Sequence, residues 1–281
     1  MPNPILLTKL AGGEEVPTLG QGTWMMGERG ARRHEEADAL RLGLDLGMTL
    51  IDTAEMYASG GAEEVVADAM TGRRDEVFLV SKVLPSNASR SGVPAACEDS
   101  LKRLKTDRID LYLYHWRGGT PLAETIEALD RLQQSGKVRH WGVSNFDTDD
   151  MQELALLPAG DRVQTNQVLY NLSRRGPEFD LLPWQRERGI PTMAYSPVEQ
   201  GSLTHDRRLA AIAARHNATP AQMALAWTMR NGDVIAIPKA GQTAHVRENR
   251  AAVDIKLTEQ DLVELDKAFP PPGRKRSLEM I

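Results

Sequence analysis

Residues 109–146 read IDLYLYHWRGGTPLAETIEALDRLQQSGKVRHWGVSNF. The stretch opens at Ile109 with a short, nearly continuous apolar run, and a second apolar run begins at Val138. Continuous runs, as opposed to alternating ones, are typical of parallel strands that helices cover on both faces. Between the two runs lie a helix N-cap, a proline at the first helical position, four apolar residues at helical spacing and a glycine beyond the end: Thr120, Pro121, Leu122, Ile126, Leu129, Leu132 and Gly136. The stretch therefore predicts a strand, a helix and a strand.

The same alternation extends over the whole chain. Apolar runs bounded by turn residues begin near eight positions: Leu19, Thr49, Val77, Ile109, Val138, Val163, Pro191 and Val234. Helical patterns lie between them, for example at Ala37, Leu40 and Leu44, and after Pro220. Successive runs start about 25 to 32 residues apart, enough for a strand and its returning helix, and the last gap leaves room for an extra helical segment. We predict an α/β fold, a closed (β/α)8 TIM barrel that forms a single domain over residues 1–281.

An open, doubly wound sheet is the alternative to a barrel. Such a sheet would place a GxGxxG turn between its first strand and first helix. The nearest candidate, Gly20-Gln-Gly22 followed by Gly27, does not have this spacing. The barrel is therefore the better interpretation, and no linker or low-complexity stretch divides it.

Composition excludes several classes of protein. The chain has 281 residues, 41% of them hydrophobic and 26% charged, which is typical of a globular protein and not of a disordered or fibrous one. A net charge of -5 gives no general attraction for nucleic acid. The single cysteine, Cys97, rules out an intrachain disulfide and fits a reducing compartment, so we expect a cytoplasmic protein. We expect no membrane span, no metal site and a monomer, because no long apolar run, ligand-spaced histidine set or exposed heptad is present.

In a barrel, chemistry is expected at the carboxyl ends of the strands and in the loops that follow them. Three predicted strands end on an ionisable residue: Asp52, Lys82 and His115. Tyr57 follows in the loop after Asp52. Taken singly, each of these residues is more often a helix cap, a solvated strand end or a loop anchor. Together they form a set with complementary roles, and a chance grouping becomes a poor explanation.

This set suits proton delivery to a carbonyl oxygen while a hydride arrives at the carbonyl carbon. A neighbouring ammonium, Lys82, would lower the pKa of Tyr57 and make it a better proton donor. Asp52 would keep Lys82 protonated. His115 can donate to the same oxygen from a neutral ring. Trp24 and Trp116 would supply apolar walls, although a tryptophan here is about as often plain packing.

The chain resembles the aldo-keto reductase family over nearly its whole length, and it is most similar to small bacterial members of the methylglyoxal-reductase type. The motifs occur in family order: Gly20-Gln-Gly-Thr-Trp24, Ile51-Asp-Thr-Ala-Glu-Met-Tyr57, Ser81-Lys82, His115-Trp116, Gly142-Val-Ser-Asn-Phe146, Asn166-Gln167, Ala194-Tyr-Ser-Pro197 and Ile237-Pro-Lys239. The resemblance implies NADPH-dependent reduction of aldehydes and ketones, methylglyoxal and other small or aromatic carbonyls among them. It also implies that Tyr57 is the general acid and that Trp24, Tyr57, His115 and Trp116 contact the substrate.

The resemblance further implies which residues bind the cofactor. Ser144, Asn145 and Gln167 would hold the nicotinamide carboxamide, and Tyr195 would stack on the nicotinamide ring. Lys239 would face the adenosine 2'-phosphate as a point charge. The pyrophosphate would lie along Ser196, Pro197, Val198 and Gly201, adenine would lie near Glu248 and Asn249, and the rest of the cofactor site would comprise Gly22, Thr23, Trp24, Asp52, Ile237, Pro238, Ala240 and His245.

Two departures from the family pattern bear on cofactor choice and access. Many members carry serine directly after the lysine and arginine six positions after it, where this chain has Ala240 and His245. Without that arginine we predict a softer preference for NADPH, with NADH as a weaker alternative, unless Arg247 compensates. The segments after His115 and after Tyr195 are short, so we predict an open site with easy cofactor exchange, whose pocket depends on the two tryptophans and the C-terminal tail.

Two other functions are compatible with parts of this pattern. A barrel lysine such as Lys82 could form a Schiff base, as in aldolases, if it were neutral and accessible. Asp52 beside it argues against this, since it keeps the amine protonated. A non-catalytic regulatory subunit that senses the nicotinamide redox state is the other alternative. The complete set of four residues argues against that function.

Overall fold

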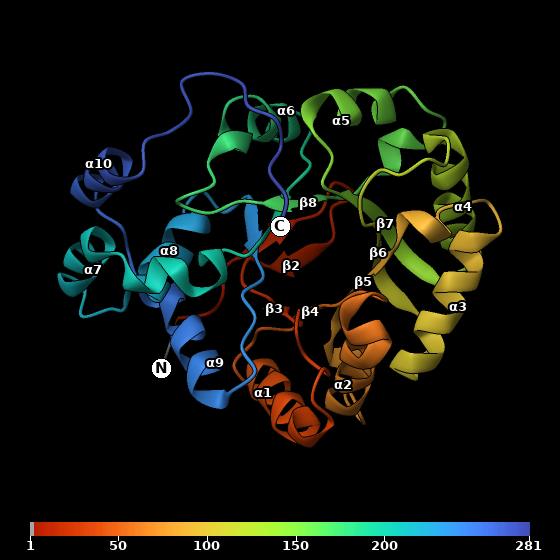
Figure 1. Cartoon of the computed structure of the whole chain (residues 1–281), viewed down its shortest axis with the longest axis horizontal. Coiled ribbons are helices and arrows are strands. Elements are labelled where there is room, and N and C mark those ends of the chain that lie inside the picture. The colour runs from red at the N-terminus through yellow and green to blue at the C-terminus, as the bar shows by residue number, and fades with distance from the viewer. Residues whose placement is uncertain (1–2) are drawn as a thin grey trace.

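The computed structural model describes residues 3–281, and its central feature is a parallel sheet of eight strands (Figure 1). The strands pair in chain order, each with the next. They are β3 (Gln21–Gly22), β4 (Leu50–Asp52), β5 (Phe78–Val83), β6 (Ile109–Tyr114), β7 (Val138–Ser144), β8 (Asn166–Leu169), β9 (Thr192–Tyr195) and β10 (Val234–Ala236). All eight predicted strands are present, which confirms the α/β fold class and the parallel arrangement.

The first and last strands meet and close the sheet into a barrel. Parallel bridges join Leu19 to Ala236 and Gly22 to Lys239. The Gly22 N–H also donates to the Pro238 carbonyl at 3.0 Å. A Cβ at position 22 would lie 2.7 Å from the Ile237 carbonyl oxygen, so this close approach of two backbones requires glycine.

Helices surround the sheet and bury apolar side chains against it or against one another. They are α1 (Arg33–Asp45), α2 (Gly61–Ala69), α3 (Gly92–Leu104), α4 (Leu122–Gln134), α5 (Thr148–Ala155), α6 (Leu181–Glu187), α7 (Arg207–Ala214), α8 (Pro220–Thr228), α9 (Thr243–Ala251) and α10 (Glu259–Ala268). The extra helical segment expected before the last strand is present, because α7 and α8 both lie between β9 and β10. Among residues 3–281, no helix has both the length and the apolar character needed to cross a membrane.

The start of α8 was readable from the sequence, whereas the predicted N-cap of α4 was not correct. Pro121 and not Thr120 is the N-cap of α4, and no side-chain hydrogen bond caps that helix, so the expected Thr120 cap was wrong by one residue. Gly136 does lie beyond the end of α4, with a positive φ of 77°. In α8, Thr219 caps the helix and exchanges hydrogen bonds with Gln222 in a capping box, which explains why that start was readable from the sequence.

An antiparallel hairpin of β1 (Leu7–Lys9) and β2 (Glu15–Pro17) was not predicted. Leu10 and Val16 from this hairpin are fully buried with the apolar side chains that fill the barrel interior, such as Leu50 and Ile235. The hairpin therefore covers the amino-terminal end of the barrel. The opposite end, where the strands finish, remains available for a site.

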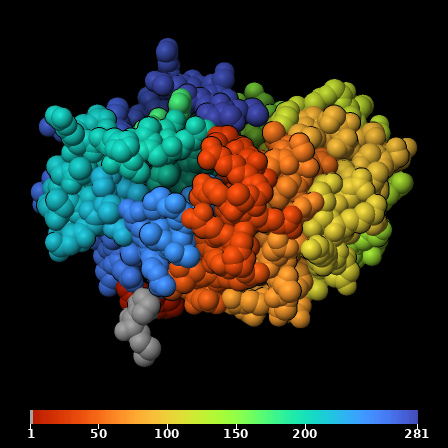
Figure 2. All heavy atoms as spheres, turned by 60° about the horizontal axis from the view of Figure 1, so that its bottom comes forward, coloured from red at the N-terminus to blue at the C-terminus, as the bar shows by residue number. Residues whose placement is uncertain are grey.

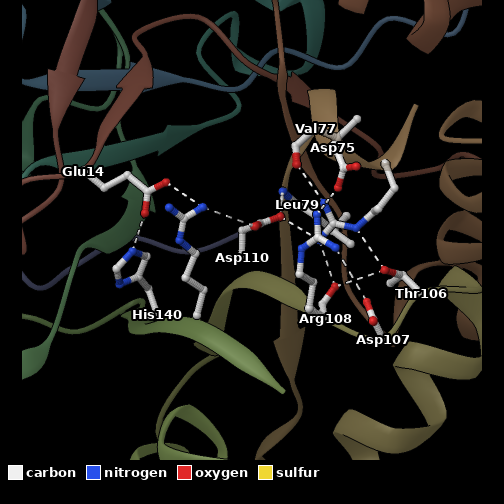
Figure 3. Close-up of polar contacts among 11 residues, drawn as sticks. Glu14, Asp75, Val77, Leu79, Thr106, Asp107, Arg108, Asp110 and His140 are labelled. Carbon is white, nitrogen blue, oxygen red and sulfur yellow. Dashed lines mark hydrogen bonds and ion pairs between the residues drawn. The ribbon is translucent and has the colours of Figure 1, made fainter. Parts of the chain in front are cut away.

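A charged network holds the hairpin against the amino-terminal end of the barrel (Figure 3). Glu14 contacts His140 Nε2 at 2.5 Å through one carboxylate oxygen and Arg139 at 2.9 Å through the other. Asp110, at the start of β6 and nearly buried, accepts from Arg74 at 2.7 Å and from a backbone N–H of β5 at 2.9 Å. These contacts are far from the strand ends that carry Asp52 and Lys82, so we assign them a structural role.

Candidate active site

Neighbouring strands bring the four predicted catalytic side chains together. Asp52 ends β4, Lys82 lies near the end of β5, and His115 directly follows β6. Tyr57 begins a short 3-10 turn after β4. Because β4, β5 and β6 pair in register, their carboxyl ends meet at one rim of the barrel. The structure thus places all four residues at a single point.

Lys82 is fully buried and satisfied by three partners. Its Nζ donates to Asp52 Oδ2 at 2.8 Å, to the Thr53 carbonyl at 2.8 Å and to the Tyr57 hydroxyl at 3.3 Å. An ammonium has three N–H donors, so none is left over. An amine that is inaccessible and paired with a carboxylate is a poor Schiff-base nucleophile, and the geometry therefore argues against the aldolase alternative.

Burial and charge act in opposite directions on Lys82 and Tyr57. Burial, the largest single influence, would lower the pKa of Lys82, but the Asp52 carboxylate and Tyr57 together outweigh burial and hold that pKa above its ordinary value. For Tyr57, burial outweighs the nearby Lys82 ammonium, and the pKa of the phenol is raised. The prediction of a lowered Tyr57 pKa was therefore wrong in sign for the protein without its ligands. The ammonium does lower the pKa, but by less than burial raises it.

His115 is held neutral. Burial first, and then the positive charge of Lys82, lower the pKa of His115 to about 2. Its ring lies edge-on to the Tyr57 ring, with centroids 6.0 Å apart, and tilted against Trp116 at 4.7 Å. A neutral imidazole in this position can donate one hydrogen bond to a substrate oxygen without adding charge.

A second polar group lies at the ends of β7 and β8. Ser144 Oγ donates to the Gln167 carbonyl at 2.8 Å, and Asn145 Nδ2 donates to the His115 carbonyl at 3.1 Å. Tyr195, at the end of β9, donates from its hydroxyl to Asn145 Oδ1 at 3.0 Å. Asn145 has a positive φ of 58°, a backbone conformation that asparagine tolerates better than most residues. These contacts fix the orientation of the Asn145 amide.

Gln167 links this group to the four residues described above. Its Nε2 donates to Asp52 Oδ1 at 2.8 Å, so the two oxygens of Asp52 are divided between Gln167 and Lys82. Within residues 3–281, no hydrogen bond reaches the Gln167 amide oxygen, which lies beside the cavity. An unused acceptor on Gln167, which lines the cavity together with Ser144, suits the NH2 of a carboxamide. The group therefore fits a nicotinamide amide.

A cavity of about 1190 Å³ opens at the carboxyl ends of the strands. Nearly every predicted site residue lines it: Gly22, Thr23, Trp24, Asp52, Tyr57, His115, Trp116, Ser144, Asn145, Gln167, Tyr195, Ser196, Pro197, Val198, Gly201, Ile237, Pro238, Lys239, His245, Glu248 and Asn249. Two predicted residues do not. Lys82 lies behind Tyr57, and Ala240 is buried away from the cavity. Arg247, considered as a compensating cation, does not line the cavity either.

The cavity has further lining residues that sequence reasoning missed: Met25, Met56, Gln200, Thr204, His205 and Ala221. Trp24, Met25 and Met56 are each more than two fifths exposed, which gives the cavity mouth an apolar rim. Met25 directly follows the Gly20–Trp24 motif and Met56 lies within the Ile51–Tyr57 motif, so their position was a usable signal. Residues such as Ala221 carry no local pattern that points to a site.

The C-terminal tail folds back over the barrel and reaches the cavity, as the position of the C-terminus in Figure 1 shows. Arg174 pairs with Glu279 at 2.7 Å, and Lys275 pairs with Asp149 at 3.3 Å and with Asp180 at 3.2 Å. Met280 and Ile281 then line the pocket, in agreement with the predicted contribution of the tail. Ion pairs with the first turn of α5 and with the segment between β8 and α6 therefore hold the tail in place.

The chain belongs to the aldo/keto reductase family, whose model matches residues 18–269. It is 50% identical over 280 residues to methylglyoxal reductase YeaE of Escherichia coli K12, covering 98% of this chain and 99% of that one. It is 33% identical over 258 residues to glyoxal reductase of Bacillus subtilis, with 92% and 91% covered. A crystal structure of an aldo/keto reductase from Klebsiella pneumoniae in complex with NADP and acetate has a TM-score of 0.96 and 49% identity, with 99% and 100% covered.

Proposed function

We propose that the protein reduces aldehydes and ketones to alcohols with NADPH, and that methylglyoxal and other small or aromatic carbonyls are its substrates. The observation that carries this proposal is the contact of Tyr57, at the cavity, with the buried and charged Lys82 at 3.3 Å. Relatives named as methylglyoxal reductase and glyoxal reductase support the substrate class. Solved relatives in complex with NADP and with NADPH support the cofactor.

The cofactor, when bound, supplies the hydride. Ser144, Asn145 and Gln167 would hold its carboxamide, and Tyr195 would pack against its ring and exclude water. The hydrogen bond from Tyr195 to Asn145 keeps the side chains of these two residues in a fixed mutual orientation. Since Gln167 also binds Asp52, the residues that orient the cofactor are connected directly to those that move the proton.

The proton comes from the Tyr57 hydroxyl. As charge develops on the carbonyl oxygen, Tyr57 donates its proton, and the Lys82 ammonium stabilises the phenolate that remains. Asp52 keeps Lys82 charged despite complete burial. His115, being neutral, would donate a hydrogen bond to the same oxygen and orient it toward Tyr57. Trp24 and Trp116 would form the apolar walls around the substrate carbon.

We further propose that residues 1–281 act as one unit, as a monomer in the cytoplasm. The single cysteine, Cys97, is fully buried, which fits a reducing compartment. Light scattering of the purified protein measures the oligomeric state directly. A stable dimer would contradict this part of the proposal without affecting the chemistry.

The test is a steady-state assay of NADPH oxidation with methylglyoxal and with an aromatic aldehyde, for wild type and Tyr57→Phe. Wild type is expected to turn over both carbonyls, and Tyr57→Phe is expected to lose at least about a hundredfold in kcat, the usual contribution of a general acid. Equilibrium binding of NADPH to both proteins is the control. If wild type binds NADPH but reduces neither carbonyl, the nicotinamide-sensing alternative becomes the better interpretation.

A further inference from the structure

Two cations approach each other beside the adenosine end of the cavity: Lys239 lines the cavity, and Arg32 lies next to Lys239 without lining the cavity itself. Lys239 follows β10 and lines this part of the cavity, together with His245 and Glu248. Arg32 comes from a distant part of the chain, at the end of the short 3-10 turn that precedes α1. Arg32 lies in none of the family motifs and was not among the predicted site residues.

Gly241 shows how close the two cations lie. A Cβ at position 241 would lie 3.3 Å from Lys239 Nζ and 3.7 Å from Arg32 Nη2. The two nitrogens are therefore at most 7.0 Å apart, the sum of those distances. The space between them stays open because residue 241 has no side chain. A phosphate group placed there would contact both cations, with the guanidinium offering a planar pair of donors and the ammonium a point charge.

Barrel closure brings these two residues together. α1 and α9 pack against each other, since the first and last units of the barrel are neighbours. Figure 2 shows their surfaces side by side, α1 in orange-red and α9 in blue. The start of α1 therefore lies beside the loop between β10 and α9, although more than half of the chain separates them in sequence.

Within residues 3–281, little neutralises this pair. No ion pair or hydrogen bond involves the Lys239 side chain. Arg32 pairs through Nε with Glu35 at 3.2 Å, at the surface, which leaves its Nη edge for another acceptor. Glu36 is the acidic group nearest to Gly241. Its Cγ faces the position of the missing Cβ at 3.7 Å, and its Oε2 accepts from the Gly27 N–H at 2.9 Å.

We propose that Arg32 and Lys239 together bind the 2'-phosphate of NADPH in the space left by the missing side chain of Gly241. This contact would determine the preference for NADPH over NADH. This inference rests on the proposed function. Many family members carry an arginine six positions after the lysine, where this chain has His245. Arg32 supplies the permanent guanidinium from the other side of the site. The preference for NADPH is then firm, in contrast to the softer preference that the sequence predicts.

Equilibrium binding tests this proposal without relying on turnover. Dissociation constants for NADPH, NADH and adenosine 2',5'-bisphosphate are measured by titration calorimetry for wild type, Arg32→Ala and Arg32→Lys. Arg32→Ala is expected to weaken NADPH and the bisphosphate by about tenfold or more, the usual effect of losing one charge-assisted hydrogen bond, and to leave NADH within about twofold. Arg32→Lys, which keeps the charge but loses the planar donor pair, is expected to fall between wild type and Arg32→Ala.

Arg29→Ala is the matched control, because Arg29 is an exposed arginine on the same loop. It is expected to change none of the three constants by more than about twofold. Gly241→Ala is the second variant, since a methyl group there fills the space between the cations, and it is expected to weaken NADPH and leave NADH unchanged. Both Arg32→Ala and Gly241→Ala leave the catalytic residues untouched.

Four results would overturn the inference. One is equal weakening by Arg32→Ala and Arg29→Ala. Another is equal weakening of NADPH and NADH by Arg32→Ala, which would mean that the loop was disturbed as a whole. The third is a wild type that binds no NADPH, in which case the proposed function fails as well. A wild type that binds NADPH tightly, together with an Arg32→Ala variant that binds it equally well, removes the role of Arg32 alone.

Discussion

Replacing Asp52 by asparagine would leave a buried charge without its partner. Asp52→Asn keeps the shape and hydrogen-bonding capacity of the side chain but removes the negative charge 2.8 Å from Lys82 Nζ. Lys82 is fully buried, and Asp52 is 2% exposed. Removing one member of a buried pair costs about 3 to 5 kcal/mol, most of it the penalty on the remaining charge. We expect the free energy of unfolding at about pH 7 to fall by this amount.

The pH dependence of the free energy of unfolding should also change sign in Asp52→Asn. In wild type the pKa of Lys82 is raised above its ordinary value of 10.5, so the pair stabilises the protein fully below that value and its contribution is lost as pH rises through the raised pKa. Burial is the largest single influence on the pKa of Lys82, and in Asp52→Asn, where the carboxylate no longer opposes it, burial lowers that pKa. The unfolded chain then holds that proton more tightly than the folded protein does. The stability of Asp52→Asn should therefore increase with pH up to the ordinary value.

Urea unfolding followed by tryptophan fluorescence at about pH 7 and about pH 9.5 measures both effects. The double variant Asp52→Asn/Lys82→Met is the control, because it buries no charge, and it should recover most of the loss. A loss below about 1 kcal/mol in Asp52→Asn, or a pH slope equal to that of wild type, would refute the reasoning.

Other perturbations test separate parts of the structure. Asp110→Ala should lower the free energy of unfolding by about 2 to 3 kcal/mol in urea, because it leaves buried donors unpaired, whereas Asp107→Ala at the exposed surface should cost under about 0.5. The unfolded chain protonates His115 below its ordinary pKa of 6.5 and the folded protein only near 2, so stability should fall as pH drops below 6.5, and less steeply in His115→Asn. Arg174→Ala loosens the tail and should raise KM for the carbonyl up to about fivefold with little change in kcat. In stopped-flow experiments, NADPH binding and release should show no slow phase from a lid that closes or opens, since segment 196–206 is short.

Regular elements were predictable because their signals are local. A buried strand or an amphipathic helix repeats its pattern within a few residues, and a capping box such as that of Thr219 marks a helix start. The hairpin of β1 and β2 was missed because three-residue strands are too short to show alternation, and Leu7 is exposed on its surface. Only its packing under the barrel identifies it.

The site was predictable where its residues lie at the ends of consecutive strands, because a barrel places those strand ends side by side. Once eight parallel strands are inferred, Asp52, Lys82 and His115 must meet at adjoining strand ends. The direction of the pKa shift of Tyr57 was not predictable, since it depends on two opposed quantities, burial and the field of Lys82, and sequence reveals only that both are present. The same holds for Ala240, whose side chain turns away from the cavity that its neighbour Lys239 lines.

Arg32 illustrates a different limit. A motif records residues that share one stretch of chain, whereas the cation pair joins the loop after the last strand to the loop before the first helix. These two loops are neighbours only because the Gly22 backbone meets the last strand and closes the barrel. The loss of an arginine at position 245 therefore says little about cofactor choice until the first and last units of the barrel are considered together. In a closed barrel, a missing charge in the last loop can be replaced from the first.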